Sequence, residues 1–108
     1  MNIKKHLKDV KIMNIEEKLG YVMLGYEKAI AALMDLDHKS ETIQKLVNLI
    51  YQLQCGDSVV ENDTSDTRKY FAENHIQQMS ERKNDYLDMF SVEEYEYLLS
   101  ALYSFGNN

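Results

Sequence analysis

The chain contains one long stretch of regular apolar spacing, Ile12-Met-Asn-Ile-Glu-Glu-Lys-Leu-Gly-Tyr-Val-Met-Leu-Gly-Tyr-Glu-Lys-Ala-Ile-Ala-Ala-Leu-Met-Asp-Leu36. Apolar side chains recur in it at alternating intervals of three and four, which is typical of a helical face buried against other helices. The residues of this stripe are Ile12, Ile15, Leu19, Val22, Tyr26, Ala29, Leu33 and Leu36. Residues 19–26 carry no charge, and Leu24 on the opposite side is also apolar. We therefore predict a central helix covered on several sides.

The first twelve residues differ from this stretch in charge. They contain four lysines and one aspartate, a local charge of +3, and a short apolar stripe of Ile3, Leu7 and Val10. A helix continuous with the central one would turn the lysines Lys4, Lys8 and Lys11 onto the buried face. We therefore predict a separate, short basic helix over 1–12. Asn14 is expected to cap a fresh helix, with Glu17 at the reciprocal position, so that the central helix covers about 15–36.

Two further helices, joined by a linker, are expected between the central helix and the last helix. Ser40 is a suitable cap for a one-sided helix over 41–55, and Gly56 suits the left-handed residue that often follows a helix. Residues 56–66 form a polar, acidic linker. A third long helix is expected over 67–88 with Asp66 as its cap, continuing through the polar run at 80–85 and bending after it.

The last helix has the clearest start signal. Ser91-Val-Glu-Glu94 is a capping box, with Phe90 and Tyr95 placed as the hydrophobic staple, and Gly106 follows the apolar pattern as a stop. This predicts a helix over 92–105. Together the segments predict an all-α fold, a compact four-helix bundle (15–36, 41–55, 67–88 and 92–105) with a short basic N-terminal helix.

Length and composition agree with one helical domain over 1–108. The chain has no proline and only four glycines, which is few for a β-sandwich or barrel. Cys55 is the only cysteine, which excludes an intramolecular disulfide and favours a reduced, cytoplasmic setting. Neither a signal peptide nor an apolar run long enough for a membrane span is recognised, so no membrane association is expected.

The sequence offers no catalytic or metal-binding constellation. His6, His38 and His75 fall in different segments without metal-ligand spacing, and His75, beside the apolar line of its helix, is expected to be a packed or half-exposed histidine. Cys55 lies at the end of a helix where the dipole does not stabilise a thiolate. No cofactor is expected. Gly25, with Ala29 and Ala32 on the same side of its helix, favours close approach of another helix there over a ligand cavity.

The acidic C-terminal half carries the functional prediction. From residue 57 onward, eleven acidic residues stand against four basic ones, a local charge of −7. Tyr70 and Tyr97 lie opposite the apolar lines of their helices, and Glu93 and Glu96 lie on the same side as Tyr97. Exposed tyrosines among carboxylates are typical of a binding surface for a basic protein. The alternative is that both tyrosines pack within the fold or against a second copy.

We predict a small non-enzymatic binding protein that neutralises or chaperones a basic protein, such as an immunity protein or antitoxin that covers a toxin or effector. The partner-binding residues would be Tyr70, Glu93, Glu96 and Tyr97. One alternative is a dimeric regulatory protein that contacts nucleic acid through its lysine-rich N-terminus, although the net charge of −6 makes a nucleic-acid partner unlikely. Another is an enzyme with an unrecognised pocket. A homodimer through the central helix is compatible with each.

Overall fold

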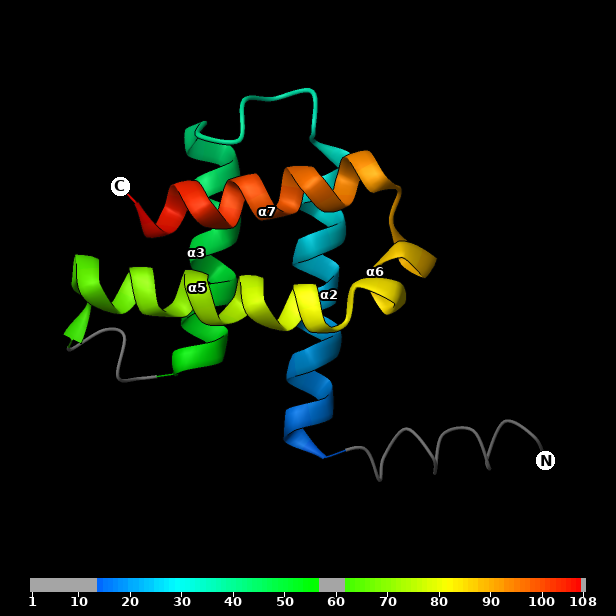
Figure 1. Cartoon of the computed structure of the whole chain (residues 1–108). Coiled ribbons are helices and arrows are strands. Elements are labelled where there is room, and N and C mark those ends of the chain that lie inside the picture. Colours follow the sequence, from blue (N-terminus) through cyan, green and yellow to red (C-terminus); the bar gives the residue numbers. More distant parts are fainter. Residues whose placement is uncertain (1–13, 57–61, 108) are drawn as a thin grey trace.

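The computed structural model describes residues 14–56 and 62–107, and this part of the chain is built from helices (Figure 1). The predicted all-α helical bundle is confirmed. The long helices are α2 (Ile15–Ala32), α3 (Glu41–Cys55), α5 (Ser65–Glu81) and α7 (Val92–Gly106), and α6 (Lys83–Met89) is a short one between α5 and α7. The basic helix predicted over 1–12 and residues 57–61 of the linker lie outside the described residues.

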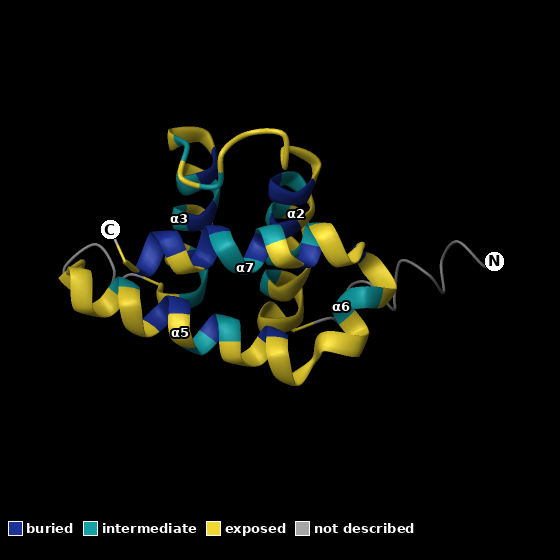
Figure 2. Ribbon diagram, turned by 45° about the horizontal axis from the view of Figure 1, so that its top comes forward, coloured by how far each residue is buried: buried dark blue, intermediate teal, exposed yellow. Residues whose placement is uncertain are grey.

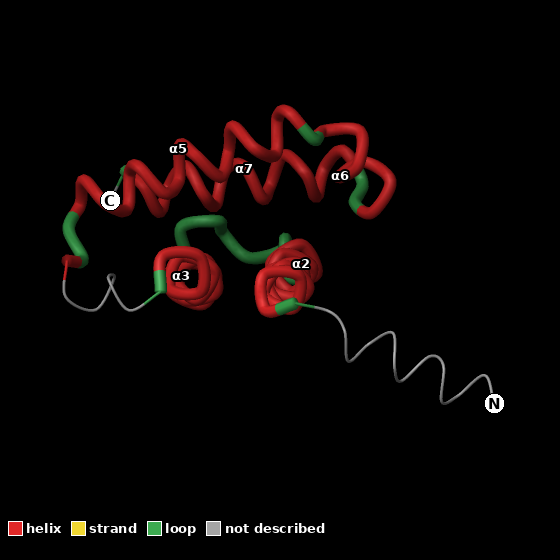
Figure 3. The backbone as a smooth tube through the Cα atoms, turned by 90° about the horizontal axis from the view of Figure 1, so that it is seen from below, coloured by secondary structure: helices red, strands yellow, loops and turns green. Residues whose placement is uncertain are grey.

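The helices form two pairs that lie crosswise. α2 and α3 form an antiparallel hairpin, and α5 and α7 form a second antiparallel pair that runs across it (Figures 1 and 3). α7 packs against α2, α3, α5 and α6. The prediction that the helix over 15–36 is the central element is therefore wrong, because α7 has that role.

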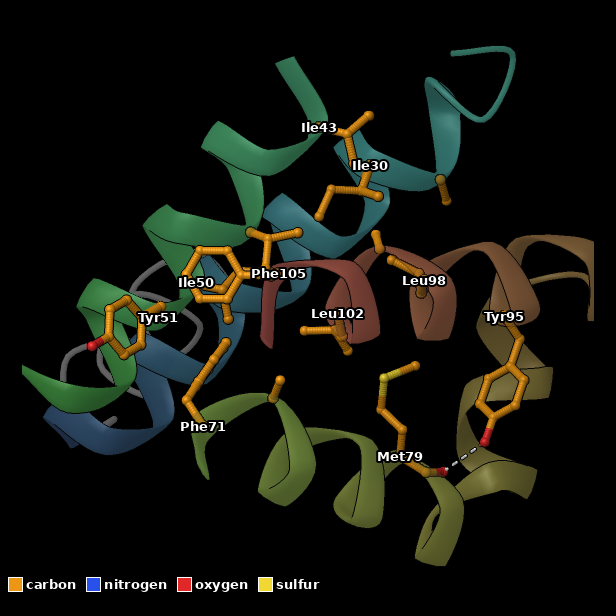
Figure 4. Packing of buried hydrophobic residues seen from close by; sticks show 14 of the residues in the cluster. Ile30, Ile43, Ile50, Tyr51, Phe71, Met79, Tyr95, Leu98, Leu102 and Phe105 are labelled. Carbon is orange, nitrogen blue, oxygen red and sulfur yellow. Dashed lines mark hydrogen bonds between the residues drawn. The ribbon is translucent and has the colours of Figure 1, made fainter. Parts of the chain in front are cut away.

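An aromatic cluster joins the two pairs (Figure 4). Tyr51 of α3 packs against Phe71 of α5 and Phe105 of α7, with ring centroids 5.2 and 5.3 Å apart, and Phe71 meets Phe105 at 5.8 Å. All three side chains are buried. Tyr95 extends the core toward the start of α7, where its hydroxyl donates to the carbonyl of Met79 at 3.2 Å. Edge and tilted contacts of this kind add specific geometry to the burial of large apolar area.

The buried face of α2 is not the predicted one. Glu27, Ile30 and Ala31 are the buried residues of this helix, whereas Ile15 is 68% and Val22 46% exposed. Its N-terminal half extends past the α5–α7 pair (Figure 1). The apolar period is real, but only part of the predicted stripe is covered: Tyr26 packs against the core, whereas Ile15 and Val22 face solvent. Periodicity identifies an apolar face without saying which neighbour covers it.

The predicted N-terminal caps at Asn14, Ser40 and Ser91 are confirmed. The backbone N–H of Glu17 donates to Asn14 Oδ1 at 2.8 Å, and that of Ile43 donates to Ser40 Oγ at 3.5 Å. The Ser91 capping box is complete, because Glu94 N–H donates to Ser91 Oγ at 3.1 Å and Ser91 N–H donates to Glu94 Oε1 at 2.8 Å. Gly56 has the expected positive φ of 66° after α3.

Three predicted boundaries are wrong. α2 ends at Ala32 instead of 36, because the N–H groups of Leu33 and Met34 turn to carbonyls three residues back. α5 begins at Ser65, and its cap is Thr64, which forms a reciprocal pair with Thr67, rather than Asp66. The helix predicted over 67–88 is two helices, since the backbone at Arg82 leaves helical geometry with φ −109° and ψ 29°.

Gly106 lies at a close contact between α5 and α7. A Cβ at Gly106 would lie 2.7 Å from the Cβ of Ala72, so the helix pair needs glycine there for space. At Gly25, by contrast, an added Cβ would meet nothing within 4 Å in the described structure. The close helix approach predicted at Gly25 is therefore not found between the described helices.

Within residues 14–56 and 62–107, the helices lack the combination of length and hydrophobicity that crossing a lipid bilayer requires.

Candidate functional site

Tyr97 connects α7 to the turn after α2. Its hydroxyl lies 2.6 Å from the carbonyl oxygen of Leu36, to which it donates, and 3.4 Å from that of Leu33. The ring is half-buried and meets His38 edge-on at 6.5 Å. Burial raises the pKa of the Tyr97 hydroxyl, and the carboxylates of Asp37 and Asp35 raise it further. Tyr97 therefore fixes the α2–α3 connection to α7, which is the packing role that the sequence left open.

This contact joins two segments that carry exposed carboxylates. Asp35 and Asp37 belong to the α2–α3 connection, and Glu93 and Glu96 project from the first turns of α7. Glu93 lies one helical turn before Tyr97 on the same face. We call Asp35, Asp37, Glu93 and Glu96 the acidic edge. All four are exposed, and Figure 2 shows most of the α2–α3 connection and the first turn of α7 in the exposed colour.

The acidic edge has no cationic counterpart in the described part of the chain. The ion pairs there join Lys45 to Glu41, Arg68 to Asp63, Arg82 to Asp85 and His75 to Glu27, and none includes a carboxylate of the acidic edge. The α2–α3 turn that carries Asp35 and Asp37 also carries three exposed apolar side chains. These are Leu33, Met34 and Leu36.

Tyr70 lies elsewhere. It is 74% exposed on α5, near the end of the helix pair where Gly106 meets Ala72. Tyr95, at the other end of α7, reaches Met79, which is nine residues or about 14 Å along α5 from Tyr70. The structure thus brings Glu93, Glu96 and Tyr97 together and leaves Tyr70 apart from them.

A cavity of about 590 Å³ adjoins the acidic edge, with His38, Lys39, Ser100, Tyr103 and Ser104 in its wall. His38 Nδ1 and the buried hydroxyl of Ser104 are 2.8 Å apart, a hydrogen bond between side chains 66 residues apart in the sequence. Gln44 Nε2 donates to the His38 carbonyl at 2.8 Å and holds its backbone. These bonds hold the end of the α2–α3 connection in place and complete the support of Asp35 and Asp37.

A second polar cluster lies inside the bundle and joins four helices. Glu27 and His75 are each 5% exposed, and Tyr86 donates to Glu27 Oε2 at 2.9 Å. His75 Nδ1 is 3.1 Å from Gln54 Oε1, and since an amide oxygen only accepts, Nδ1 carries a proton. His75 Nε2 lies 3.5 Å from Glu27 Oε2, which is an ion-pair distance without hydrogen-bond geometry.

This buried cluster has a structural role. Neither Glu27 nor His75 lines the cavity beside His38 or the groove between α2 and α6. Burial raises the pKa of Tyr86, and the charge of Glu27 and its hydrogen bond raise it further. The cluster links α2 to α6 through Glu27 and Tyr86 and links α3 to α5 through Gln54 and His75. His75 is thus packed, which is one of the two environments that the sequence predicted.

In the described residues, no group of three or more histidine, cysteine, aspartate or glutamate side chains is arranged to hold a metal ion. Comparisons of the chain with protein-family models, curated proteins and solved structures returned no match.

The sequence did not identify Asp35 and Asp37 as part of the site. They were placed at the end of the predicted central helix and in the connection after it, and only the bonds of Tyr97 and His38 bring them to α7. Glu27 was likewise missed. Glu27 lies about 100° around the helix from Tyr26 and off the predicted stripe, so the apolar spacing offered no signal of its burial.

Proposed function

We propose that the chain is a non-enzymatic binding protein that holds a basic protein partner at its acidic edge, in the manner of an immunity protein or antitoxin. The observation that carries the proposal is the gathering of four exposed carboxylates, without an ion-pair partner among the described residues, around an exposed apolar turn. Carboxylates steer a basic partner toward the surface, and the apolar side chains supply area to bury once it docks.

Rigidity of the surface supports the same proposal. Tyr97 and His38 fix both parts of the α2–α3 connection to α7, so the carboxylates are held in place before a partner arrives. A preorganised surface loses less conformational freedom on binding, which raises affinity. Tyr97 contributes here as a support for the turn, and Tyr70 on α5 is not part of the acidic edge.

The test is a comparison of charge-reversed variants in partner capture from the native host. One variant carries Asp35→Lys, Glu93→Lys and Glu96→Lys, and the control carries Glu73→Lys, Glu81→Lys and Asp88→Lys. The three control residues are exposed and lie on α5 and α6, so the change in net charge is the same. Tyr97 stays unchanged in both, because its loss would disturb the turn itself.

We expect the wild type and the control to capture the same protein of net positive charge and the acidic-edge variant to lose it. For the purified complex, the dissociation constant should rise by about 100-fold or more in the acidic-edge variant, because close interfacial charge pairs carry large coupling energies. Equal loss of capture in both variants would mean that the net charge of the chain, and not the acidic edge, determines binding. Capture unaffected by the acidic-edge reversal would refute the proposal.

A further inference from the structure

α2 has an outer face that lies opposite its buried side. It consists of six residues at helical spacing, Ile15, Lys18, Val22, Gly25, Ala29 and Ala32. All are exposed except Ala29, which is half-exposed, and a Cβ at Gly25 would meet nothing within 4 Å. In the described part of the chain, no helix covers this face.

The composition of the outer face is that of a packing surface. The solvent side of a surface helix is normally charged or polar, yet here five of the six residues are apolar or glycine and Lys18 is the only charge. An exposed strip that is mostly apolar is typical of a site of association. Ile15, Val22 and Ala29 belong both to this face and to the predicted apolar stripe, so a partner that covers the face accounts for part of the apolar period.

Side-chain size is sorted along the face. The bulky residues Ile15 and Val22 lie in the N-terminal half of α2, and the small ones, Gly25, Ala29 and Ala32, lie in the C-terminal half. An antiparallel pairing of two such faces sets large residues against small ones throughout. In one register Ile15 faces Ala32 and Val22 faces Gly25 of the other copy, with Lys18 over Ala29. Alternation of large and small side chains is what lets helices interdigitate closely.

We propose that the outer face of α2 binds the same face of a second copy, in an antiparallel, two-fold symmetric dimer. One face meeting itself is the arrangement that two-fold symmetry requires. This inference does not use the acidic edge and goes beyond the proposed function.

Charge argues against the basic partner as the occupant of the outer face. The face has no carboxylate to attract a basic protein, and the amine of Lys18 would repel one. In the antiparallel register the two Lys18 residues are eleven residues apart along the paired helices, or about 16 Å. That distance exceeds the screening length of about 8 Å at physiological salt, so the two amines hardly repel. The Lys18 stem can cover Ala29 with its amine in water.

The first experiment is sedimentation equilibrium of the full chain, the Val22→Glu variant and the Val92→Glu variant. Val92 is a matched control, because it is 57% exposed at the start of α7 and away from the outer face. We expect the wild type and Val92→Glu to dimerise alike and Val22→Glu to raise the dimer dissociation constant by about 100-fold, since it buries an unpaired charge. Circular dichroism checks that each variant is folded.

A wild type that stays monomeric up to about 1 mM would overturn the proposal, since a dissociation constant above that concentration is too weak for a stable interface. In that case another segment of the chain or a different protein covers the face. A dimer that Val22→Glu leaves intact, or that both variants weaken equally, would also overturn it.

The second experiment tests the antiparallel register by cross-linking. In a Cys55→Ser background, Ile15→Cys and Ala32→Cys proteins are mixed, oxidised and analysed by mass. A disulfide requires Cα atoms within about 7 Å. We expect the mixed product, in which one Ile15→Cys chain is joined to one Ala32→Cys chain, to exceed both self-linked products. A Tyr103→Cys protein, changed at an exposed site on α7, should give little product. Dominant self-linking of the Ile15→Cys protein indicates parallel pairing and would overturn the proposed arrangement.

Discussion

Gly106 shows how one residue sets the distance between two helices. A methyl group at this position would lie 2.7 Å from Ala72 Cβ and 3.4 Å from the Cα of Lys69, which is backbone and cannot move alone. We expect Gly106→Ala to lower the free energy of unfolding by about 1–3 kcal/mol, as overpacking of a close contact does. Urea denaturation followed by circular dichroism measures the change.

Gly20→Ala is the control for this prediction. Gly20 is also inside a helix, but an added Cβ there would meet nothing within 4 Å. Alanine should therefore raise the free energy of unfolding by about 0.4–1 kcal/mol through helix propensity and a less flexible unfolded chain. If Gly106→Ala is as stable as Gly20→Ala, the α5–α7 contact has room that the structure does not show.

Tyr86 links the buried carboxylate of Glu27 to the stability of the protein at high pH. Its pKa in the folded state is raised above the ordinary value of 10.0, chiefly by burial. The unfolded chain therefore releases this proton first. The contribution of Tyr86 to stability is complete below pH 10 and is lost progressively as the pH rises above it, by up to about 1.4 kcal/mol per pH unit.

Denaturation curves between pH 8 and about 11.5 test this prediction. Tyr51 and Tyr97 also have raised pKa values, so the informative quantity is the difference between the wild type and Tyr86→Phe. At pH 8 the variant should be less stable by about 1.5–3 kcal/mol, because Glu27 loses a hydrogen-bond donor. Above pH 10 the gap should narrow. A gap independent of pH would mean that Tyr86 ionises as easily in the folded protein as in the unfolded chain.

At the scale of elements, the start of α7 matters more than other helix starts because α7 contacts every other long helix. Ser91 accepts from the Glu94 N–H at 3.1 Å within a complete capping box, whereas Ser40 accepts from the Ile43 N–H at 3.5 Å without a reciprocal partner. We expect Ser91→Ala to destabilise the fold by about 1 kcal/mol or more, and Ser40→Ala by about half of that. Paired urea denaturation curves measure both, and the reverse order would contradict the geometry.

The contrast between predicted and observed elements has a physical origin. Caps at Asn14, Ser40 and Ser91 depend on hydrogen bonds that span three residues, so the sequence alone identified them. The break at Arg82 could not be found in the same way. Its polar surroundings fit an exposed helix, and what accompanies the change of direction is the long-range bond of Tyr86 to Glu27, 59 residues away.

The candidate site divides in the same manner. Glu93, Glu96 and Tyr97 were placed on one side of their helix by spacing alone, and the structure keeps them together. Asp35 and Asp37 lie in the turn after α2, which Tyr97 fixes to α7. This turn exists because α2 ends four residues earlier than its apolar pattern indicates. Helical period predicts neighbours on one helix, but contact between helices depends on where each helix stops.

At the scale of the whole molecule, two surfaces of opposite character lie on different parts of the chain. The acidic edge uses the connection after α2 and the start of α7, and the outer face uses α2 itself. One surface is charged and the other nearly uncharged. The contact between two copies would therefore depend on apolar packing, and the contact with a basic partner on charge. The two contacts use different side chains, so one chain can make both at the same time.

Salt should separate the two kinds of association. Between 0.05 and 0.5 M NaCl the screening length falls from about 14 to about 4 Å, which weakens attraction between the acidic edge and a basic partner. Two copies that each carry a net charge of −6 repel one another, so the same salt removes repulsion from the dimer. We expect the dissociation constant of the partner complex to rise by about 10-fold or more, and that of the dimer to fall or stay constant. Titration calorimetry measures the first and sedimentation equilibrium the second. If salt dissociates the dimer, charge holds it together and not the apolar outer face. If the dissociation constant of the partner complex does not change with salt, the acidic edge is not part of that interface.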